Sequence, residues 1–579
     1  MSNSQKGFGE YSKESNTKQD ELERKEILST HDNYNSTRHE IIAGSLDAIL
    51  KDQNFLNLLI VVSILAPQNI PKDLLQKYAD PRLINRFIKE LKKYSLITSE
   101  TVLKNRSVFS LHATIQSTIR DYLKSKYSPQ AYEEALYRSV LLIEKYVNGL
   151  VETLAYEEAQ SMLAHLDTAR NQTDLPVGIL GILNLGYVNL LTTRPALPSN
   201  ILVPLLVKTL EDITQNLPQS LYDPLREARC LSILGDRYRA LSMYDKARNA
   251  LEKSLETYES LTPSSLEAAR AHVRMGIFLR MIRKPEIAKI SFSKALDIYK
   301  HYPSEYMPKE TLFSIAFNER DRGNYKSAVE YLQHDLDSVK DKNDPWFYWI
   351  KDYMAGLYYN MGCYKKSLEY YGATEMFKYE ANSTEPTLAY ATKLAYVGSI
   401  YAIHEDTTKA MTCLEQSSDI FKRIAGKNDV HVTYYTIVLP YIAYCNILKK
   451  EYANAKRLLE FTLNELCARF KDDPLYPLKI RTYLARIAMK EKNFNEAEKI
   501  LHEVIDSLVP TNHPNVFFPM ETLSDVLYEK YRITKDPTLA KKYKDQARDL
   551  LSKAIHLVEE RICSQSEHLH RMRKKLRRL

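Results

Sequence analysis

The chain has 579 residues, of which 44% are hydrophobic and only 15 are glycine. This length exceeds one ordinary hydrophobic core, so several domains or a repeat array are expected. So few glycines argue against folds that depend on glycine-rich turns or phosphate-binding loops, and the abundance of Leu, Ala, Lys, Glu and Tyr favours helices.

The formal net charge of +8 is mostly local. Six positive charges lie near the C-terminus, so the rest of the chain carries only +8 − 6 = +2; these six are Arg571, Arg573, Lys574, Lys575, Arg577 and Arg578. Such a tail could bind nucleic acid, an acidic membrane or a nuclear import receptor. The predicted basic tail spans residues 563–579. The alternative is that it is only the solubilising, frayed end of the last helix.

Residues 1–40 are polar and contain no hydrophobic secretion-signal core, so we expect a disordered leader. The longest apolar run, Phe55–Ala66, is shorter than the ~20 residues that a membrane span needs. It predicts a buried helix, and the protein is expected in the cytoplasm, with export into a host by an unrecognised signal left open.

Residues 41–125 predict a small domain. Three helices are expected, the first around Ile42 and Leu46, the second over the apolar run and the third from Asp80-Pro81. Two short strands flank a turn at Lys104-Asn105, and a helix from about His112 to Leu123 follows. This order is typical of a winged-helix domain with one β-hairpin.

Three strings of this domain carry a resemblance: LIVVSILAPQNIPKDLL, RFIKELKKYSLI and VFSLHATIQSTIRDYL. They resemble the winged-helix module that joins a P-loop ATPase to a repeat sensor in STAND proteins of the NB-ARC and NACHT type. Phe109-Ser110-Leu111-His112, with Gln116 and Arg120, is the most family-like part. Only about 40 polar residues precede it, and no G-x-x-x-x-G-K-[ST] occurs. Nucleotide switching is therefore not expected.

Residues 126–215 are helical but irregular, and predict a connector with one or two degenerate hairpins. A period then appears over 216–562. A small residue recurs at spacings of 41, 40, 39, 43, 45, 42 and 50, at Ala247, Ala288, Ala328, Ser367, Ala410, Ala455, Ala497 and Ala547. Twelve residues before the first seven lies a second small residue: Gly235, Gly276, Ala316, Ala355, Gly398, Ala443 and Ala485.

Four residues after each first-series position stands a large apolar residue, for example Leu251, Phe292 and Leu414. Two antiparallel helices pack closely where small residues face each other, and a bulky residue one turn later fills the space beside them. Such a hairpin cannot bury its apolar face alone, so copies stack. The pattern predicts about eight stacked hairpins.

The strings LGDRYRALSMYDKARNALEKSL at 234–255 and VGSIYAIHEDTTKAMTCLEQSS at 397–418 resemble tetratricopeptide repeats. The period near 42 is similar to that of the kinesin-light-chain variety. The resemblance implies an all-α, right-handed superhelix that binds another protein in its groove. No catalytic motif occurs, so no enzymatic activity and no cofactor are expected.

The first helices of three repeats supply the candidate partner-binding residues Arg229, Arg239, Arg270, Arg280 and Arg320, with Phe313 and Phe317 beside them. Five arginines with two aromatic rings suit carboxylates or phosphate, so the expected partner is acidic. The alternative is pairing with local acids such as Asp236, Glu310 and Asp321. The carboxylate clamp of chaperone-binding repeats is not matched.

A second candidate surface, in repeats four to six, is aromatic and apolar and contains Trp349, Tyr359, Tyr444 and Ile447. It could hold apolar side chains of a peptide, or it could be inter-helix packing. The six cysteines, Cys230, Cys363, Cys413, Cys445, Cys467 and Cys563, form no C-x-x-C pair and predict buried free thiols. Cys563, His568 and His570 lack a fourth ligand with suitable spacing, so no metal site is expected.

Two further functions remain open from the sequence. One is a DNA-binding regulator that reads DNA with the helix Arg82–Lys93, which carries Arg82, Arg86, Lys89, Lys92 and Lys93. The other is a regulatory remnant of a STAND protein whose ATPase is encoded separately or lost. A binding scaffold is the favoured function.

Overall fold

The computed structural model describes residues 41–579 apart from 78, 104–105, 193–197, 340–341, 343, 373–386, 425–432, 470–474 and 512. The expected disordered leader lies outside these residues. Contacts divide the chain into two compact units: the first comprises residues up to Arg274 and Ile298–Tyr306, and the second comprises Met275–Asp297 and Met307–Leu579.

The first unit begins with a small helical domain that carries a sheet. After a helix over 41–49 come α2 (Leu56–Ile64), β1 (Ile70–Pro71), α3 (Lys72–Gln76), α4 (Pro81–Lys93), β2 (Ile97–Leu103), β3 (Arg106–Leu111) and α5 (Ala113–Lys126). Helix α4 begins where expected, because the Asp80 side chain accepts a hydrogen bond from the Arg82 N–H and Pro81 occupies the first turn.

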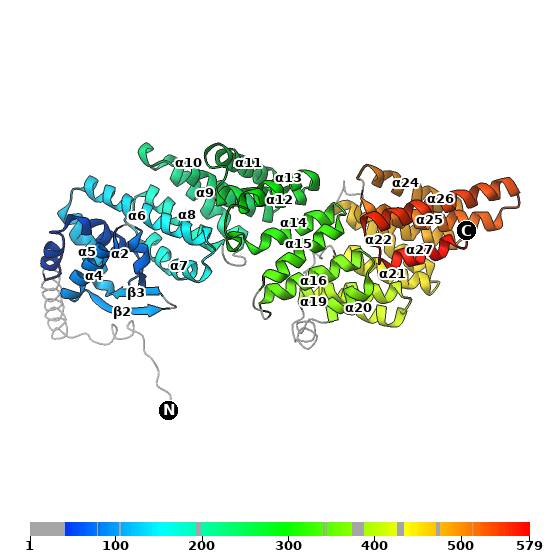
Figure 1. The fold of residues 1–579 in the computed structure, drawn as a ribbon, viewed down its shortest axis with the longest axis horizontal. Coiled ribbons are helices and arrows are strands. Elements are labelled where there is room, and N and C mark those ends of the chain that lie inside the picture. The colour runs from blue at the N-terminus through cyan, green and yellow to red at the C-terminus, as the bar shows by residue number, and fades with distance from the viewer. Residues whose placement is uncertain are drawn as a thin grey trace, which may run out of the picture. The chain divides into compact units, whose positions relative to one another are not determined.

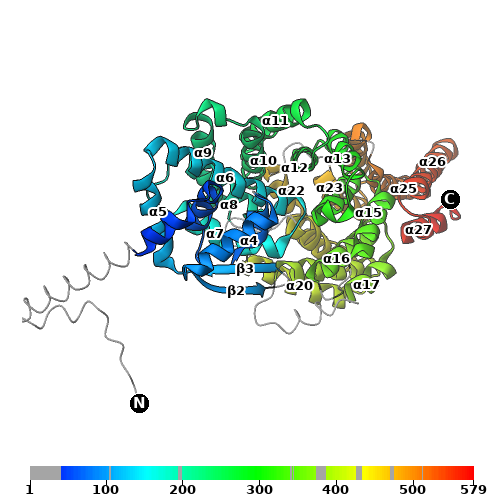
Figure 2. The same ribbon diagram turned by 60° about the vertical axis from the view of Figure 1, so that its left-hand side comes forward.

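The sheet has three antiparallel strands in the order β1-β3-β2, and Figure 2 shows β2 and β3 side by side. The hairpin was predicted, whereas the two-residue strand β1 is too short to show alternation. Gln116 and Arg120 donate hydrogen bonds to the carbonyls of Val62, Leu65 and Ser63 at the end of α2. The family-like motif therefore caps a buried helix whose last carbonyls need partners.

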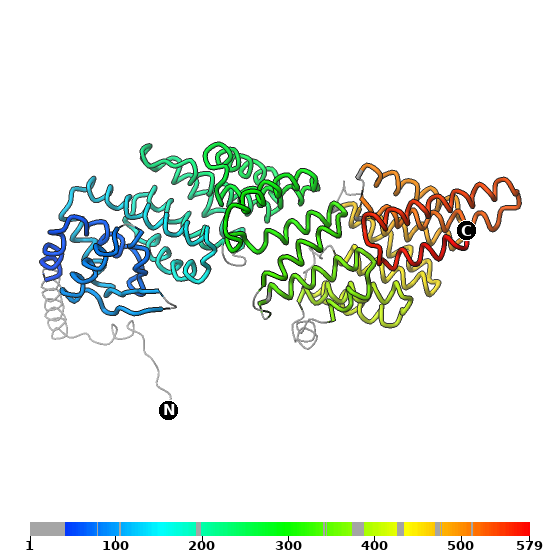
Figure 3. The backbone as a smooth tube through the Cα atoms, viewed as in Figure 1, coloured from blue at the N-terminus to red at the C-terminus, as the bar shows by residue number. Residues whose placement is uncertain are grey.

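Ten helical hairpins follow in the described part of the chain (Figures 1 and 3). Their helices are α6 (Pro129–Glu152) and α7 (Tyr156–Arg170), α8 (Val177–Leu191) and α9 (Ser199–Gln215), α10 (Pro224–Ala240) and α11 (Tyr244–Leu261), α12 (Leu266–Met281) and α13 (Pro285–Tyr299), α14 (Lys309–Asp321) and α15 (Tyr325–Ser338), α16 (Pro345–Asn360) and α17 (Tyr364–Gly372), α19 (Leu388–Ile403) and α20 (Thr407–Ile424), α21 (Leu439–Leu448) and α22 (Tyr452–Arg469), α23 (Leu475–Lys490) and α24 (Phe494–Leu508), and α25 (Phe517–Ile533) and α26 (Pro537–Arg561). Helix α21 is entered through a π-helical turn at Tyr434–Val438. The last eight hairpins are the eight predicted repeats, and the first two occupy 126–215.

The hairpin turns share one register. Five residues before the small residue, the chain adopts left-handed backbone with φ between 59° and 78°, at Ser242, Arg283, Gly323, Gly362, Glu405, Lys450 and Lys492. The next N–H bonds the carbonyl five residues earlier, as in Met243 to Tyr238, which is a Schellman motif. Leu154 and Ala155 repeat this arrangement before the buried Ala159, so the turn of α6–α7 has the same geometry.

The small residues lie where the helices of a hairpin meet. All eight of the first series are buried. A Cβ on Gly235 would come within 2.7 Å of the Leu251 side chain and 3.2 Å of the Ala247 carbonyl oxygen. Gly276 is equally close to Phe292, and Gly398 to Leu414. At these three glycines the two helices of the hairpin approach each other closely.

The C-terminal segment differs from the expected frayed end. It forms a separate helix, α27 (Glu567–Leu576), in which Leu569 and Met572 are buried in the core of the second unit. Apolar residues at this spacing give the short helix one buried face, which its basic composition had masked. Among the described helices, none is both long and apolar enough to cross a bilayer.

Candidate functional site

Two of the predicted arginines meet in the second unit at a single carboxylate. Arg280 of α12 lies 3.1 Å from Asp321, and Arg320 of α14 donates two hydrogen bonds to the other oxygen of Asp321, at 3.0 and 2.8 Å. Burial raises the pKa of Asp321, but the two guanidiniums outweigh burial and hold that pKa below its usual value. Two cations therefore share one anion, and one positive charge is left over.

Both guanidiniums also face the ring of Phe317, with distances to the ring centroid of 5.0 Å for Arg280 and 4.7 Å for Arg320. The Nε of Arg280 is buried and has no hydrogen-bond partner among the described residues.

An aromatic surface adjoins this pair. Tyr353 of α16 packs edge-on against Phe317 and Phe313, with centroid distances of 4.5 and 4.3 Å, and Trp346 lies 5.0 Å from Phe313. Tyr353 is 40% exposed, and Trp349, 6.0 Å from Trp346, is 49% exposed. We define the arginine–aromatic site as Arg280, Arg320, Phe313, Phe317, Trp346 and Tyr353.

Sequence reasoning had named the arginines and phenylalanines of this site but not Trp346 or Tyr353. Both missed residues lie on α16, beside groove positions assigned from the small-residue register. Their signal is the cluster Trp346-Phe347-Tyr348-Trp349, which opens α16 directly after the Asp344 cap. An aromatic run stands out at the start of a helix, because Asp and Glu are the residues enriched in a helix's first turn.

The three predicted arginines in the first unit also have partners within the fold. Arg229 bonds Glu267 at 3.1 Å and lies 3.8 Å from Glu144. Arg239 donates two hydrogen bonds to Asp236, at 2.9 and 2.8 Å. These contacts match the alternative of local pairing.

Arg270 has a structural role that the sequence did not suggest. Its Nη2 donates to the carbonyls of Val151 and Glu152, at 2.7 and 2.9 Å, where α6 ends. The guanidinium thus caps helix α6, whose last carbonyls have no partners within the helix. A substitution of Arg270 would therefore lower the stability of the fold, so a loss of binding in that variant could not be assigned to the binding site.

The second predicted surface, that of repeats four to six, is largely interior. Tyr359 is buried and its hydroxyl bonds that of Tyr441 at 2.7 Å, while Tyr444 stacks on Tyr483 with centroids 5.2 Å apart. The ammonium of Lys479 lies 4.8 Å from the Tyr441 ring centroid, and burial lowers its pKa to about 8. Tyr359, Tyr444 and the buried Ile447 therefore contribute to packing between hairpins, whereas Trp349 belongs with the exposed aromatic surface.

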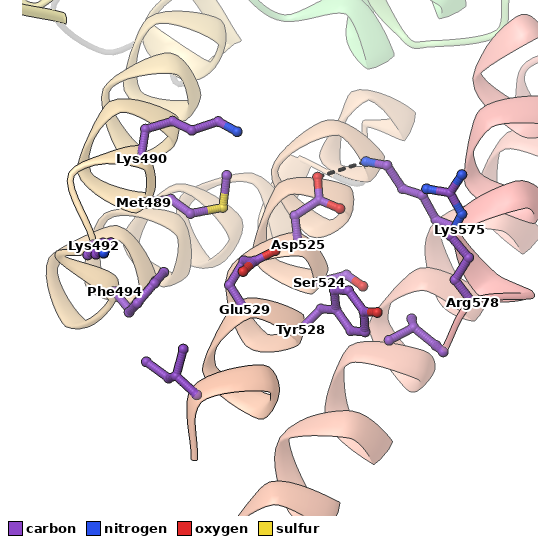
Figure 4. A pocket seen from close by; sticks show the side chains of 12 residues that line it. Met489, Lys490, Lys492, Phe494, Ser524, Asp525, Tyr528, Glu529, Lys575 and Arg578 are labelled. Atoms are coloured by element: carbon purple, nitrogen blue, oxygen red, sulfur yellow. Dashed lines mark hydrogen bonds and ion pairs between the residues drawn. The ribbon is translucent and has the colours of Figure 1, made fainter. Parts of the chain in front are cut away.

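A cavity of about 680 Å³ lies elsewhere in the second unit, between the α23–α24 turn, α25 and the end of α27 (Figure 4). Its two acids are already paired, Asp525 with Lys575 at 2.7 Å and Glu529 with Arg532 at 3.2 Å. Lys490, Lys492 and Arg578 also line it. Exposed lysines around an open cavity are common on solvated surfaces, although Phe494 and Tyr528 also line this one.

No family model matches the chain, and no curated protein matches it. Among solved structures, it is similar to a signal-transduction ATPase with numerous domains (STAND) that has a tetratricopeptide repeat sensor, from Pyrococcus horikoshii. The two are 13% identical over 90% of this chain and 65% of that one, with a TM-score of 0.35. This chain thus spans slightly less than two thirds of that protein.

Two further similarities cover nearly the whole of the other protein. A Rap protein complexed with Competence and Sporulation Factor is 13% identical over 61% of this chain and 99% of its own, with a TM-score of 0.39. Kinesin-light-chain-like repeats from Podosopora anserina are 15% identical over 34% of this chain and 96% of their own, with a TM-score of 0.30. The chain resembles tetratricopeptide-repeat proteins.

Proposed function

We propose that this protein is a non-catalytic scaffold whose repeat array binds an acidic segment of a partner protein. The arginine–aromatic site carries the proposal, because Asp321 is the one described acid that pairs with Arg280 and Arg320, which leaves one positive charge. The exposed ring of Tyr353 beside them offers an apolar surface for a neighbouring side chain. A segment with Asp or Glu next to a bulky apolar residue fits both features.

The test uses the full chain and two fluorescent peptide pools, one rich in Asp, Glu and Phe and the other with Asn and Gln in place of the acids. We expect the acidic pool to bind more tightly, with affinity that falls as salt rises. Changing Arg280 and Arg320 to Gln should weaken binding at least about tenfold, since charge-assisted hydrogen bonds contribute about 1.5–3 kcal/mol each.

Arg532→Gln is the control, because it removes one positive charge from an exposed ion pair with Glu529 and leaves the arginine–aromatic site intact. It should leave anisotropy titrations unchanged. Equal binding of both pools, or equal loss in the control, would contradict the proposed site. Affinity capture with the wild type and the double variant then identifies the natural partner.

We further propose that residues 41–125 form a winged-helix domain with a structural role. The DNA-binding alternative is less well supported because the charges of α4 are largely paired: Arg86 with Asp52, Lys92 with Glu100, and Lys93 with Glu90. Titrating the full chain with duplex DNA at low salt distinguishes a structural domain from a DNA-binding domain. Salt-sensitive binding would favour the DNA-binding function.

A further inference from the structure

Two cysteines that are 200 residues apart in the sequence meet in the second unit. The Cys363 thiol, in the turn between α16 and α17, donates a hydrogen bond to the sulfur of Cys563 at 3.4 Å. Cys563 lies in the short connection between α26 and α27. Both residues are free thiols and both stand outside helices, where the backbone can adjust.

The two turns are held against each other by contacts other than the thiols. The Glu567 N–H donates to the Gly362 carbonyl oxygen at 2.9 Å. A Cβ on Gly362 would lie 2.5 Å from both the Ser566 hydroxyl and the His568 ring, so only glycine permits this approach. The Tyr364 hydroxyl and the His568 ring nitrogen are 3.2 Å apart. The thiols are therefore pre-positioned by the fold.

We propose that Cys363 and Cys563 form a reversible disulfide that fastens helix α27 to the α16–α17 turn. A disulfide has an S–S bond of about 2.05 Å, so the sulfurs must approach by about 1.4 Å. Movement on this scale is within reach of two adjacent turns. The oxidant is a low-molecular-weight disulfide such as glutathione disulfide.

The reaction proceeds by two thiol–disulfide exchanges. The Cys563 thiolate attacks one sulfur of glutathione disulfide, forms a mixed disulfide and releases one glutathione thiolate. The Cys363 thiolate then attacks the Cys563 sulfur, forms the protein disulfide and releases the second glutathione thiolate. The two protons from the protein thiols go to the two glutathione thiolates, so two protein thiols are oxidised and one glutathione disulfide is reduced.

The environment of each sulfur assigns the order of attack. Cys563 is half-buried, so an external disulfide can reach its sulfur, which accepts a hydrogen bond from the Gln565 N–H at 3.3 Å. Cys363 is only 7% exposed, and burial together with its hydrogen bond to Cys563 raises its pKa to about 12. Cys563 therefore reacts first with the external disulfide, and Cys363 resolves the adduct.

The bond would secure a helix that covers part of the second unit. Arg571 and Lys575 of α27 pair with the buried Glu521 of α25. The disulfide would limit the opening of this contact, because it closes a 200-residue loop between the two turns. Oxidation would thus hold the inner face of α25 covered.

The test uses the full chain carrying Cys467→Ser, which removes the exposed cysteine and its intermolecular cross-links. The protein is equilibrated with glutathione buffers of rising disulfide content, trapped with N-ethylmaleimide and mapped by mass spectrometry without reduction. We expect a Cys363–Cys563 cross-link that disappears on reduction. Persistent alkylation of both thiols, or an adduct that stops at Cys563, would overturn the disulfide.

Two further variants define specificity. Cys363→Ser should leave Cys563 as a thiol or a glutathione adduct, whereas Cys413→Ser, which removes a half-buried cysteine elsewhere, should cross-link like the parent. The rate of trypsin cleavage after Arg571 measures how firmly α27 is held. We expect this rate to be about tenfold lower in the oxidised protein, because the disulfide restricts the local opening of α27. Equal cleavage rates in both redox states would show that the bond does not fasten α27.

Discussion

The carboxylate of Glu521 is completely buried in α25 and accepts two hydrogen bonds from the guanidinium of Arg571, at 2.8 and 2.6 Å. Lys575 adds a second ion pair at 2.8 Å. Burial raises the pKa of Glu521, but Arg571 and Lys575 outweigh burial and lower that pKa well below its usual range. Much of the C-terminal positive charge is thus used within the fold.

Replacing Glu521 with Gln should release α27 and destabilise the second unit by about 2–4 kcal/mol, because buried ion pairs are costly to break on one side. Both tryptophans of the chain, Trp346 and Trp349, lie in this unit, so their fluorescence during urea unfolding reports on it selectively. Glu559→Gln is the control, since Glu559 pairs with Arg573 at an exposed position and should cost under about 0.5 kcal/mol.

Acidification should also weaken the second unit through two buried histidines. Burial lowers the pKa of His568 to about 3 and that of His513 to about 4. Both pKa values lie below the value of about 6.5 in the unfolded chain. The neutral imidazoles therefore make their full contribution to the free energy of unfolding above about pH 6.5, and this contribution is lost as pH falls toward 4.

Each histidine should therefore cost about 2 kcal/mol between pH 7.5 and pH 5. Urea unfolding followed by tryptophan fluorescence at both pH values measures the loss. His568→Gln should show a shallower pH dependence than the wild type. Parallel curves for the two proteins would argue against a buried neutral imidazole at this position.

Gly362→Ala should destabilise the second unit by about 2 kcal/mol or more. The residue has φ near +70°, and an added Cβ would meet Ser566 and His568 at 2.5 Å. Gly149, inside helix α6, has no atom within 4 Å of its Cβ position, so Gly149→Ala should stabilise the first unit by about 0.5–1 kcal/mol. Thermal unfolding of both variants tests the opposite signs.

The first unit should lose stability on the alkaline side. Burial and a hydrogen bond with Glu267 raise the pKa of Glu152 to about 8. Because this pKa exceeds that of Glu152 in the unfolded chain, the protonated carboxyl makes its full contribution to stability below about pH 4.3. The contribution is lost as pH rises through 8. Glu152→Gln, which resembles the protonated acid, should be more stable than the wild type by about 1–2 kcal/mol at pH 8 and equal at pH 4.

The tryptophans lie in the second unit and cannot report on the first, so stability of the first unit is measured by hydrogen exchange of the α6 amides at the two pH values. Glu211→Gln, at an exposed position on α9, provides the control and should behave like the wild type at both pH values, because it keeps Glu152. A destabilised Glu152→Gln variant at pH 8 would mean that the carboxylate is ionised and favourably paired there.

The register of the eight hairpins was predictable because close helix packing demands small residues at fixed intervals, as at Gly235 and Ala247. The turns themselves gave little signal, since Arg283, Glu405 and Lys450 occupy the left-handed position that glycine usually marks. The docking of α27 on Glu521 joins residues 50 apart, and Cys363 meets Cys563 across 200 residues; no local pattern encodes such contacts. The arginines were found, but their sharing of Asp321 required the structure.

One contact of the α14–α15 turn bears on how the second unit folds. A Cβ on Gly323 would lie 2.1 Å from the Pro514 ring, the Tyr325 hydroxyl bonds Asn515 at 3.1 Å, and the Lys326 ammonium bonds the Glu560 carbonyl at 3.3 Å. In an open solenoid each repeat touches only its neighbours and the ends can unzip. Here contacts span about 190 and 234 residues, so closing them delays folding and couples distant hairpins. The second unit is therefore expected to melt in one cooperative transition, with no stepwise loss of terminal repeats.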